Sequence, residues 1–425
     1  MQSSKLRVLL IAEACNPTFT SVPLVGYNLV RALADRDELD VTVASQVRNR
    51  DALEADPIAK RAQLVCIDNE RIARPLHRLS KLLRGGQGLS WTTGTAMAWP
   101  SYMYFEKMLF KQLQSLFQQR QFDIVHRITP LTPTMGSPMA KMVGVPMVIG
   151  PLNGGLPWPM EYPELRSQER EWLVPLRGLY KHLPYYKSTY KNVAAVISGS
   201  RHTATEVPSY FTGMRFQMPE NGIDPVRFPI REAWPTPGER FRFITVGRLV
   251  PYKGIDMILE AMAGSESLKQ CELIVVGEGP QRPALEAQIK ASGLERNVVL
   301  TGWKSQHELA AELGQAQAFV FPSLREFGGG VVLEAMASGL PSIIVDYGGP
   351  TELLDASCGI RLPLLPRAQL VAKLRTAMTE LMNDPEKCRA MSLSARTRVR
   401  AEFTWEAKAE KVVSMYRQIL ASKGI

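Results

Sequence analysis

Short apolar runs, each bounded by turn-forming residues, recur along the chain. Continuous apolar runs of about four to eight residues are typical of strands that are buried on both faces of a parallel sheet. An amphipathic helical pattern at 26–34 separates the first two runs. The runs of the first half lie at 6–12, 39–44, 122–126, 146–150 and 193–198.

The second half alternates more regularly between strand-like and helix-like patterns. This repetition predicts right-handed crossovers and a doubly wound sheet, which binds ligands outside the carboxyl ends of its strands. The predicted strands lie at 241–246, 271–276, 297–300, 318–321 and 342–345. The predicted helices lie at 254–263, 281–292, 307–316 and 330–338.

A chain of 425 residues is long enough for two domains, each with its own core. We place the boundary near 211–224, because a stretch rich in proline and charge follows it. The sequence therefore predicts an α/β protein of two Rossmann-like, doubly wound domains, 1–215 and 216–403, that face each other across a cleft. We expect the last helix, 404–422, to pack back on the N-terminal domain.

Composition narrows the class of protein. Hydrophobic residues make up 45% of the chain and charged residues 22%, as in soluble globular proteins. No apolar stretch reaches the length of a membrane span, and the first residues lack the layout of a signal peptide. Five scattered cysteines suggest neither a disulfide framework nor a Cys-x-x-Cys pair, which indicates a cytoplasmic protein. Five histidines without clustered spacing argue against a metal site.

The positive charge is unevenly distributed. Residues 1–215 carry 26 Lys and Arg against 17 Asp and Glu, whereas 216–425 carry 25 against 24. The first half is therefore the part expected to meet an anionic lipid or an anionic acceptor. A merely solvated basic face explains the charge alone equally well.

The most informative segment runs from Arg325 to Gly339 and contains two glutamates, Glu326 and Glu334. Three glycines after Glu326 let a bulky anion approach the backbone, and the N–H groups of a helix start attract negative charge. The flanking carboxylates can accept hydrogen bonds from hydroxyls. A cradled phosphate between hydroxyl-binding carboxylates suits a nucleotide-sugar better than a hydride carrier.

A second motif, Gly247 to Gly254, follows a predicted strand and opens a helix. Arg248 can clamp phosphate oxygens with its planar fork, and Lys253 supplies a compact point charge. An Arg and a Lys on a turn are usually solvated. Their position at the carboxyl end of a strand, between glycines, favours a role in binding.

Together these motifs resemble the family 4 retaining glycosyltransferases, the group 1 transferases with the GT-B fold. The resemblance is strongest over 216–360, where several motifs occur in the family's order and spacing. The motifs are Asn221-Gly222-Ile223-Asp224, Gly247-Arg248-Leu249 with Lys253-Gly254, Val276-Gly277-Glu278-Gly279-Pro280, Phe321-Pro322-Ser323, the paired glutamates with 335–341, and Asp346-Tyr347-Gly348-Gly349.

The resemblance implies a role for each motif. Arg248 and Lys253 would neutralise the diphosphate of a nucleotide-sugar donor, and Glu334 would bind the ribose hydroxyls. The base would lie near Gly302 and Trp303. The donor sugar and the distal phosphate would be held by Glu326 and by the backbone N–H groups of Phe327, Gly328, Gly329 and Gly330.

The resemblance also implies a reaction without metal or other cofactor that retains the anomeric configuration. Fixed cations and a helix N-terminus can stabilise the departing nucleoside diphosphate. Double displacement needs a carboxylate nucleophile beneath the sugar, and the sequence offers no secure one. Front-face attack, in which the leaving phosphate accepts the acceptor's proton, fits these residues better.

The N-terminal half departs from the family pattern. Many members carry paired glycines after the first strand, whereas 16–26 has only one; Thr20 and Ser21 are candidate donor contacts in their place. His126, at the end of a strand-like run, could contact the donor sugar, or it could be a satisfied histidine at a strand end. The segment 151–155 resembles a Gly-Pro-x-Gly-Gly motif and is a candidate for the acceptor side.

Residues 71–84 contain no acid and carry a basic stripe beside an apolar stripe. This pattern is typical of an interfacial helix on anionic lipid, and Pro75 is expected to limit the helix to its C-terminal part. We therefore predict a peripheral contact with the cytoplasmic face of a membrane. Most aromatic residues at 99–117 and 172–190 are instead expected to pack inside the N-terminal domain.

The leading functional prediction is transfer of a sugar from a nucleotide-sugar to a hydroxyl of a saccharide or lipid-linked saccharide, in bacterial polysaccharide or glycan biosynthesis. The alternatives are a GT-B enzyme with a small acceptor, such as a sugar phosphate or a polyol, and a non-catalytic sugar-nucleotide-binding subunit. An oxidoreductase is disfavoured, because the run at 277–280 lacks the third glycine of the dinucleotide fingerprint. No motif supports nucleic-acid binding.

Overall fold

The computed structural model describes residues 5–84, 91–168 and 179–424, which form two compact units. The first unit comprises Met1–Gly155, Ser167–Glu220 and Lys408–Ile425, and the second comprises Leu156–Arg166 and Asn221–Ala407. The last helix therefore belongs to the first unit from Lys408 onward. The division between the units falls within the region 211–224. The boundary follows Glu220, and Leu156–Arg166 belongs to the second unit rather than the first.

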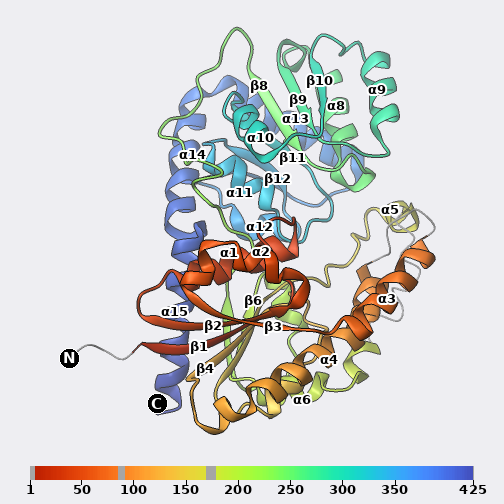
Figure 1. The fold of residues 1–425 in the computed structure, drawn as a ribbon. Coiled ribbons are helices and arrows are strands. Elements are labelled where there is room, and N and C mark those ends of the chain that lie inside the picture. Colours follow the sequence, from red (N-terminus) through yellow and green to blue (C-terminus); the bar gives the residue numbers. More distant parts are fainter. Residues whose placement is uncertain (1–4, 85–90, 169–178, 425) are drawn as a thin grey trace. The chain divides into compact units, whose positions relative to one another are not determined.

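The first unit is built on a seven-stranded parallel sheet in the order β3-β2-β1-β4-β5-β6-β7 (Figure 1). The chain runs outward from the middle in both directions, so the order reverses between β1 and β4, as in doubly wound folds. The strands are β1 (Leu6–Ala12), β2 (Leu39–Gln46), β3 (Ala62–Ile67), β4 (Ile124–Thr129), β5 (Met147–Leu152), β6 (Ala195–Ser198) and β7 (Met214–Gln217). The helices are α1 (Val22–Ala34), α2 (Arg50–Glu54), α3 (Glu70–Arg84), α4 (Trp91–Gln118), α6 (Tyr186–Asn192), α7 (Arg201–Glu206) and α15 (Trp405–Ser422).

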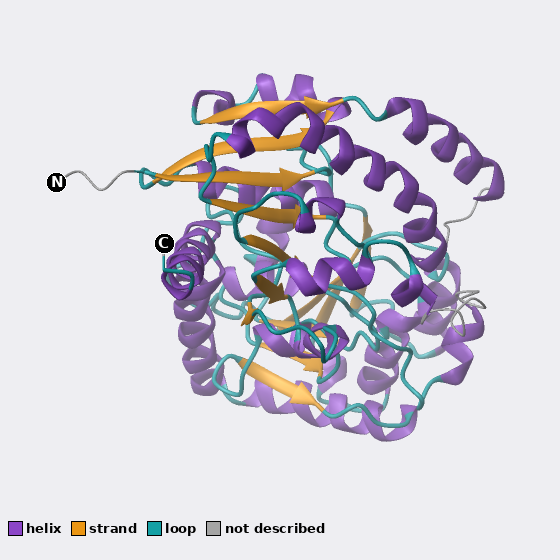
Figure 2. Cartoon of the chain, turned by 90° about the horizontal axis from the view of Figure 1, so that it is seen from below, coloured by secondary structure: helices purple, strands orange, loops and turns teal. Residues whose placement is uncertain are grey.

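The second unit repeats this plan with a six-stranded parallel sheet in the order β10-β9-β8-β11-β12-β13. Its strands are β8 (Arg242–Val246), β9 (Glu272–Val276), β10 (Val298–Gly302), β11 (Ala318–Phe321), β12 (Ser342–Val345) and β13 (Gly359–Leu362). Its helices are α8 (Ile255–Ala263), α9 (Arg282–Ala291), α10 (Gln306–Leu313), α11 (Gly330–Ala337), α12 (Pro350–Leu353), α13 (Arg367–Asn383) and α14 (Pro385–Arg398), while α5 (Pro163–Gln168) spans the unit boundary. Figure 2 shows the strands of each unit with helices packed around them. The prediction of two doubly wound parallel sheets is confirmed.

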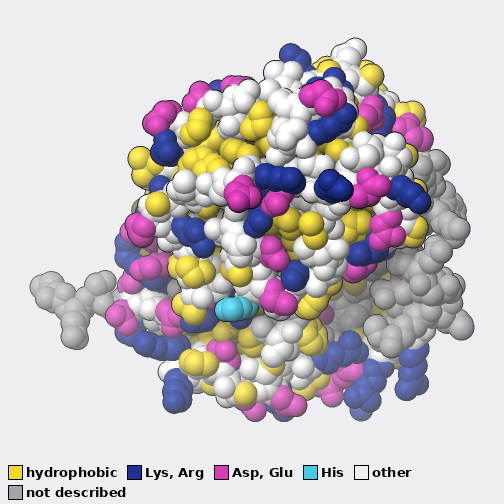
Figure 3. Space-filling model, turned by 90° about the horizontal axis from the view of Figure 1, so that it is seen from above, with side chains coloured by type: hydrophobic (Ala, Val, Ile, Leu, Met, Phe, Trp, Pro, Cys, Tyr) yellow, Lys and Arg dark blue, Asp and Glu magenta, His cyan; other side chains and the backbone are white. Residues whose placement is uncertain are grey.

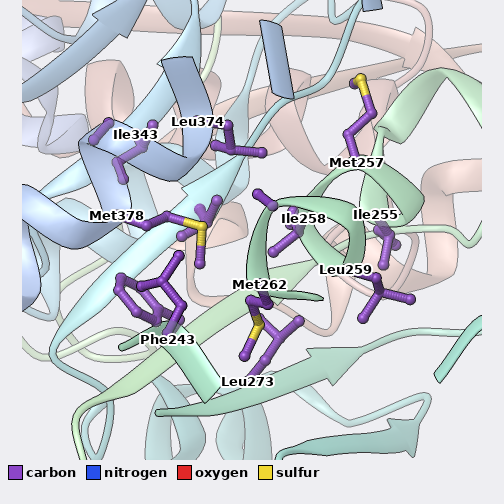
Figure 4. Close-up of a cluster of buried hydrophobic side chains, with 14 of the residues drawn as sticks. Phe243, Ile255, Met257, Ile258, Leu259, Met262, Leu273, Ile343, Leu374 and Met378 are labelled. Atoms are coloured by element: carbon purple, nitrogen blue, oxygen red, sulfur yellow. The ribbon is translucent and has the colours of Figure 1, made fainter. Parts of the chain in front are cut away.

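Helix α8 packs its apolar face onto the second sheet. Figure 4 shows Ile258 and Met262 of α8 with Phe243 of β8 and Leu273 of β9, and all four side chains are fully buried. Met378 of α13 completes this part of the cluster. Full burial of one such side chain stabilises a fold by about 1.5–3 kcal/mol. The core therefore gives a rigid base to the loops that leave the carboxyl ends of these strands.

Helices α4 and α6 bury aromatic side chains in the core of the first unit. Tyr102 and Phe105 of α4 and Tyr186 and Tyr190 of α6 are all buried in one hydrophobic cluster. The expectation that most of these aromatic residues pack inside the domain is confirmed for these four. Trp172, which the same expectation covered, lies outside the described residues.

Helix α3 begins at Glu70, upstream of Pro75, so the prediction that the proline confines the helix to its C-terminal part is wrong. Asp68 Oδ1 accepts the N–H of Glu70 at 2.9 Å, and the carbonyl of Asn69 accepts the N–H of Ala73 at 2.9 Å. These contacts hold the first turn before the position where the proline removes a donor.

Acidic and basic side chains are interspersed over the face shown in Figure 3. In the second unit Arg282, the first residue of α9, pairs with Glu278 in the preceding loop at 2.8 Å and with Glu286 on the same helix at 2.9 Å. Exposed pairs of this kind contribute at most about 1 kcal/mol each. Among the described helices, none combines the length and the apolar character that crossing a membrane requires.

Candidate functional site

The predicted donor residues gather at the carboxyl edge of the second sheet. Arg248 and Lys253 follow β8, Glu326 follows β11, and Trp303 follows β10. Because the strand order reverses between β8 and β11, their loops flank the crevice where doubly wound folds bind ligands. The topology therefore brings to one edge residues that are far apart in the sequence.

One ion pair joins the two central loops. Lys253 Nζ donates to Glu326 Oε2, and the two side chains are only 13% and 21% exposed. The same ammonium group lies 4.8 Å from the ring centroid of Phe321, within the range of a cation–π contact. Partial desolvation strengthens the attraction between the two charges. The cation predicted to meet phosphate thus already holds the carboxylate predicted to meet the sugar.

Arg248 lies next to this pair in sequence but differs from it in environment. Its side chain is exposed, and within the described part of the chain no acid pairs with it and no acceptor takes a hydrogen bond from it. A guanidinium group has five N–H donors in a planar fork. Those donors are therefore available to a ligand.

The turn from Glu326 into α11 is shaped by glycine. Gly329, the N-cap, has φ 60° and ψ 34°, and an added β-carbon would lie 3.1 Å from Pro350 Cγ. The carbonyl of Glu326 accepts the N–H of Gly349 at 2.9 Å, which fixes the start of the turn. The first N–H groups of a helix have no partner within it, so the stretch from Phe327 to Gly330 presents a backbone suited to an anion.

Glu334 lies in the second turn of α11 and is half-buried. Burial raises the pKa of its carboxyl to about 7. No described residue donates a hydrogen bond to this carboxyl. A half-buried acid without protein partners is suited to hydroxyl donors from a ligand.

Trp303 extends into solvent with 75% of its surface exposed. It follows Gly302, whose carbonyl accepts the N–H of Gly277 at 2.8 Å and so ties the end of β10 to the loop after β9. An exposed indole at the ligand edge of the sheet offers a flat surface on which a base can stack.

The predicted donor contacts of the N-terminal half lie in the first unit. Thr20 and Ser21 are exposed at the start of α1. Ser21 has φ 60° and ψ −137°, a backbone conformation that is rare outside glycine, although the family's paired glycines are missing here. The one glycine of 16–26, Gly26, is required for close packing, since a β-carbon there would lie 2.5 Å from the carbonyl oxygen of Ala14.

His126 is fully buried in β4, and both of its ring nitrogens have protein partners. Nε2 donates to the carbonyl of Gly150 at 2.7 Å, and Nδ1 accepts from the hydroxyl of Tyr416 on α15 at 2.6 Å. Burial lowers the pKa of His126 to about 4, so the ring is neutral at physiological pH. This geometry favours the satisfied-histidine interpretation over contact with the donor sugar.

Glu13, which directly follows β1, is not among the residues predicted from the sequence. Its carbonyl accepts the side-chain N–H of Asn49 at 2.9 Å and the backbone N–H of Gln46 at 3.3 Å, so its backbone is fixed. Burial raises the pKa of its carboxyl to about 7 although Arg48 is near, and no described residue donates a hydrogen bond to that carboxyl. The signal was its position, because an acid immediately after a buried strand lies at the ligand edge of the sheet.

The predicted basic stripe lies on α3. Arg71, Arg74 and Arg78 are exposed, and Arg74 also pairs with Glu70 at 2.6 Å. The side chains at 79–84 lie outside the described residues. In the part of the chain that the structure describes, no three His, Cys, Asp or Glu side chains gather as ligands for a metal ion.

Solved glycosyltransferase structures share this architecture. Sucrose-phosphate synthase from Thermosynechococcus elongatus gives a TM-score of 0.67 at 20% identity, covering 98% of this chain and 100% of that one. WaaG, a glycosyltransferase involved in lipopolysaccharide biosynthesis, gives 0.56 at 17% identity, covering 96% and 99%. The chain therefore has the GT-B fold of two Rossmann-like domains, as predicted.

Sequence comparison identifies the family of the second domain. Residues 226–398 match the glycosyl transferases group 1, so this part of the chain is a domain of that family. The alpha-D-kanosaminyltransferase of Streptomyces kanamyceticus is 30% identical over 176 residues, covering 41% of this chain and 45% of that protein. The GDP-mannose-dependent alpha-(1-6)-phosphatidylinositol monomannoside mannosyltransferase of Mycobacterium tuberculosis is 30% identical over 189 residues, covering 42% and 48%. The chain spans about half the length of these relatives.

Proposed function

We propose that the protein is a retaining, metal-independent family 4 glycosyltransferase that moves a sugar from a nucleotide-sugar donor to a hydroxyl of a saccharide or lipid-linked saccharide, in polysaccharide or glycan biosynthesis. The ion pair between Lys253 and Glu326 carries the proposal. It joins the loops after β8 and β11 at the point where ligands bind to doubly wound sheets.

The donor is proposed to bind along the carboxyl edge of the second sheet. Its diphosphate would meet Arg248, Lys253 and the N-terminus of α11, where cations and backbone dipoles favour negative charge. Its ribose hydroxyls would donate to Glu334, and its base would stack on Trp303. A solved structure of similar fold, HepE from Anabaena (TM-score 0.58, 16% identity), contains UDP and glucose, which supports a nucleotide-sugar as the ligand class.

Diphosphate binding would rearrange the Lys253–Glu326 pair. The phosphate oxygens compete for the ammonium group, which releases the Glu326 carboxylate to accept hydrogen bonds from the donor sugar. In front-face attack the acceptor oxygen bonds to the anomeric carbon while the bond from that carbon to phosphate breaks. The leaving phosphate takes the acceptor's proton, and Arg248 and Lys253 stabilise the charge that develops on it.

The acceptor is proposed to bind at the carboxyl edge of the first sheet, where Glu13 is the best-placed group for hydroxyl recognition. Its fixed backbone and unpaired carboxyl allow it to receive sugar hydroxyls in a defined geometry. We place the protein in the cytoplasm, since its five cysteines are free thiols. A peripheral position on anionic membrane through α3 would bring it to a lipid-linked acceptor.

A thermal-shift screen in EDTA tests the function. The wild-type protein is titrated with UDP, GDP, ADP and their common sugar derivatives, and a ligand that binds only the native state raises the melting temperature. We expect one nucleotide series to stabilise the protein without metal, and its sugar derivative to be slowly hydrolysed to the nucleoside diphosphate. Stabilisation without any hydrolysis or transfer would instead indicate a non-catalytic binding subunit, and no stabilisation would refute the proposal.

Vesicle flotation tests the membrane contact. Changing Arg71, Arg74 and Arg78 to Glu should abolish flotation with anionic vesicles, because each basic residue near such a surface contributes about 1 kcal/mol. The matched control changes Lys60, Arg61 and Lys111 to Glu, which alters net charge equally at exposed positions of the same unit. Equal loss in both variants, or no binding by the wild type, would exclude a contact through α3 and favour a small acceptor in solution.

A further inference from the structure

The segment Leu156–Arg166, here called the strap, leaves the first sheet after β5 but packs in the second unit. Its position in sequence directly follows 151–155, the candidate acceptor-side segment. Residues Glu326–Gly330 are here called the donor loop. Within the second unit the strap contacts Arg325, Tyr252 and Tyr347, which lie beside this loop or beside its partner Lys253. The strap is therefore more than a linker between elements of the first unit.

Arg325, the residue before Glu326, is the main attachment point. Arg325 is only 8% exposed, and its Nε donates to the carbonyl of Leu156 at 3.1 Å. Its guanidinium carbon lies 4.3 Å from the ring centroid of Trp158 and 5.0 Å from that of Phe327. A guanidinium group that contacts two aromatic rings and also donates a hydrogen bond to a backbone carbonyl has one strongly preferred position.

Two further contacts attach the strap to neighbouring loops of the same site. The hydroxyl of Tyr347, in the loop after β12, donates to the carbonyl of Pro157 at 2.9 Å. The ring of Trp158 meets the ring of Tyr252 edge-on, with centroids 5.8 Å apart, and Tyr252 precedes Lys253. The strap thus contacts the immediate neighbours of both members of the Lys253–Glu326 pair.

The donor loop needs such support because of its composition. The three glycines at 328–330 leave the backbone with few side chains to pack and with wide conformational freedom. A loop of this kind holds a defined geometry only when its flanks are fixed. We propose that the strap, through Arg325 in contact with both Trp158 and Phe327, positions the donor loop so that Glu326 and the α11 N-terminus are ordered for the donor sugar and phosphate.

This inference rests on the proposed function, because it concerns the loop assigned to donor binding. Arg325 acts through Glu326 and the backbone, so it is a positioning residue and not a catalytic one. The strap also offers a matched control. The hydroxyl of Tyr162 donates to the carbonyl of Leu365 at 2.8 Å, so Tyr162→Phe removes one strap contact at the other end of the segment.

Hydrogen exchange tests the positioning directly, without any ligand. Exchange is followed at the amides of Leu324, Val332 and Gly349, whose hydrogen bonds to the carbonyls of Tyr252, Gly329 and Glu326 hold this loop. Their rates are compared in the wild type, Arg325→Met, Arg325→Lys and Tyr162→Phe. We expect about tenfold faster exchange in Arg325→Met, an intermediate rate in Arg325→Lys, which keeps a cation between the rings, and no change in Tyr162→Phe. Unchanged exchange in Arg325→Met, or equal acceleration in Tyr162→Phe, would overturn the proposal.

Kinetics then separate positioning from general stability. With whichever nucleotide stabilises the wild type, Arg325→Met should bind the nucleoside diphosphate no more than about threefold more weakly than wild type, because Arg248 and Lys253 remain and only the contribution of the α11 N-terminus is reduced. Its kcat for the nucleotide-sugar should fall at least about tenfold and recover in part in Arg325→Lys. A kcat equal to wild type overturns the strap proposal. A wild type that binds no nucleotide overturns the function instead, and the exchange result still decides the strap.

Discussion

At the scale of single residues, the site depends on carboxyl groups whose environments differ. Glu326 is held by a lysine, whereas Glu334 and Glu13 have raised pKa values and receive no hydrogen bond from any described residue. A buried acid without partners destabilises the protein when it ionises, because the charge loses its hydration. Positions that keep such an acid are candidates for ligand contact.

Donor binding should therefore depend on pH through Glu334. Burial raises its pKa to about 7, so the group is neutral below that pH and ionised above it. The ionised form accepts hydroxyl hydrogen bonds more strongly, so donor affinity should rise about tenfold as pH increases from about 6 to 8. Isothermal titration at several pH values measures this.

The control for that effect is Glu334→Gln, which keeps the shape but cannot ionise. It should bind the donor more weakly, with a higher KM and a nearly unchanged kcat, and its affinity should lose the rise above pH 7. A pH profile identical to wild type would show that another group titrates, and a collapse of kcat alone would exclude the ribose role.

At the scale of elements, α15 is tied to the first sheet by His126. The ring of His126, on β4, is fully buried and is hydrogen-bonded to the carbonyl of Gly150 in β5 and to the hydroxyl of Tyr416 in α15. The last helix thereby closes the first unit although it comes from the far end of the sequence. The role of His126 in this geometry is structural.

His126→Leu should destabilise the first unit by about 2–4 kcal/mol, because two buried polar groups lose their partner. Tyr416→Phe removes one of the two bonds and should cost about 1 kcal/mol. Urea unfolding measured by circular dichroism compares them. A His126→Leu protein as stable as wild type but without turnover would instead support a contact with the donor sugar.

The protonation of His126 should also make the stability of the first unit depend on pH. Burial lowers the pKa of His126 to about 4, below the ordinary value of 6.5 for an unfolded chain. The unfolded state therefore binds a proton more readily, and stability should fall as pH decreases from about 6.5 to about 4, by up to about 3 kcal/mol. The His126→Leu variant should lack this part of the slope.

The sequence predicted elements well where burial is complete and poorly where it is partial. Strands β11 and β12 are buried throughout and have the bounds that their apolar runs predicted. Strands β3, β7 and β13 lie at sheet edges with mixed exposure and were missed. Strands β7 and β13 have no continuous apolar run, and in β3 only the last four residues form one. Edge position is a property of the sheet, which a local pattern does not contain.

The same limit applies to the site. Arg248, Lys253, Glu326 and Glu334 could be proposed as candidates because glycines and strand ends mark the loops that carry them or lead into their helix. Arg325 gave no comparable signal, because its partners come from the strap, more than 150 residues earlier in the sequence. Which residues support a loop depends on tertiary packing between distant segments, whereas candidates for a phosphate contact can be proposed from local composition.

At the scale of the whole molecule, two domains of similar plan have different chemistry. The second domain carries the family match and the cationic, glycine-rich edge, and the first carries the basic excess and Glu13. In both, candidate residues follow strands at the point where strand order reverses, which is where the topology leaves space for a ligand. We infer a division of labour, with donor recognition in the second domain and acceptor recognition in the first.

The proposed function depends on a diphosphate bound at the edge formed by Arg248, Lys253 and α11. Isothermal titration of a nucleoside diphosphate in EDTA tests it most directly, with wild type, Arg248→Ala, Lys253→Met and the control Lys269→Ala, a lysine paired with Glu266. We predict micromolar binding by wild type and the control, and about tenfold or greater loss in each of the other two. Absence of binding to UDP, GDP and ADP, or affinities that Arg248→Ala and Lys253→Met leave unchanged, would contradict the account.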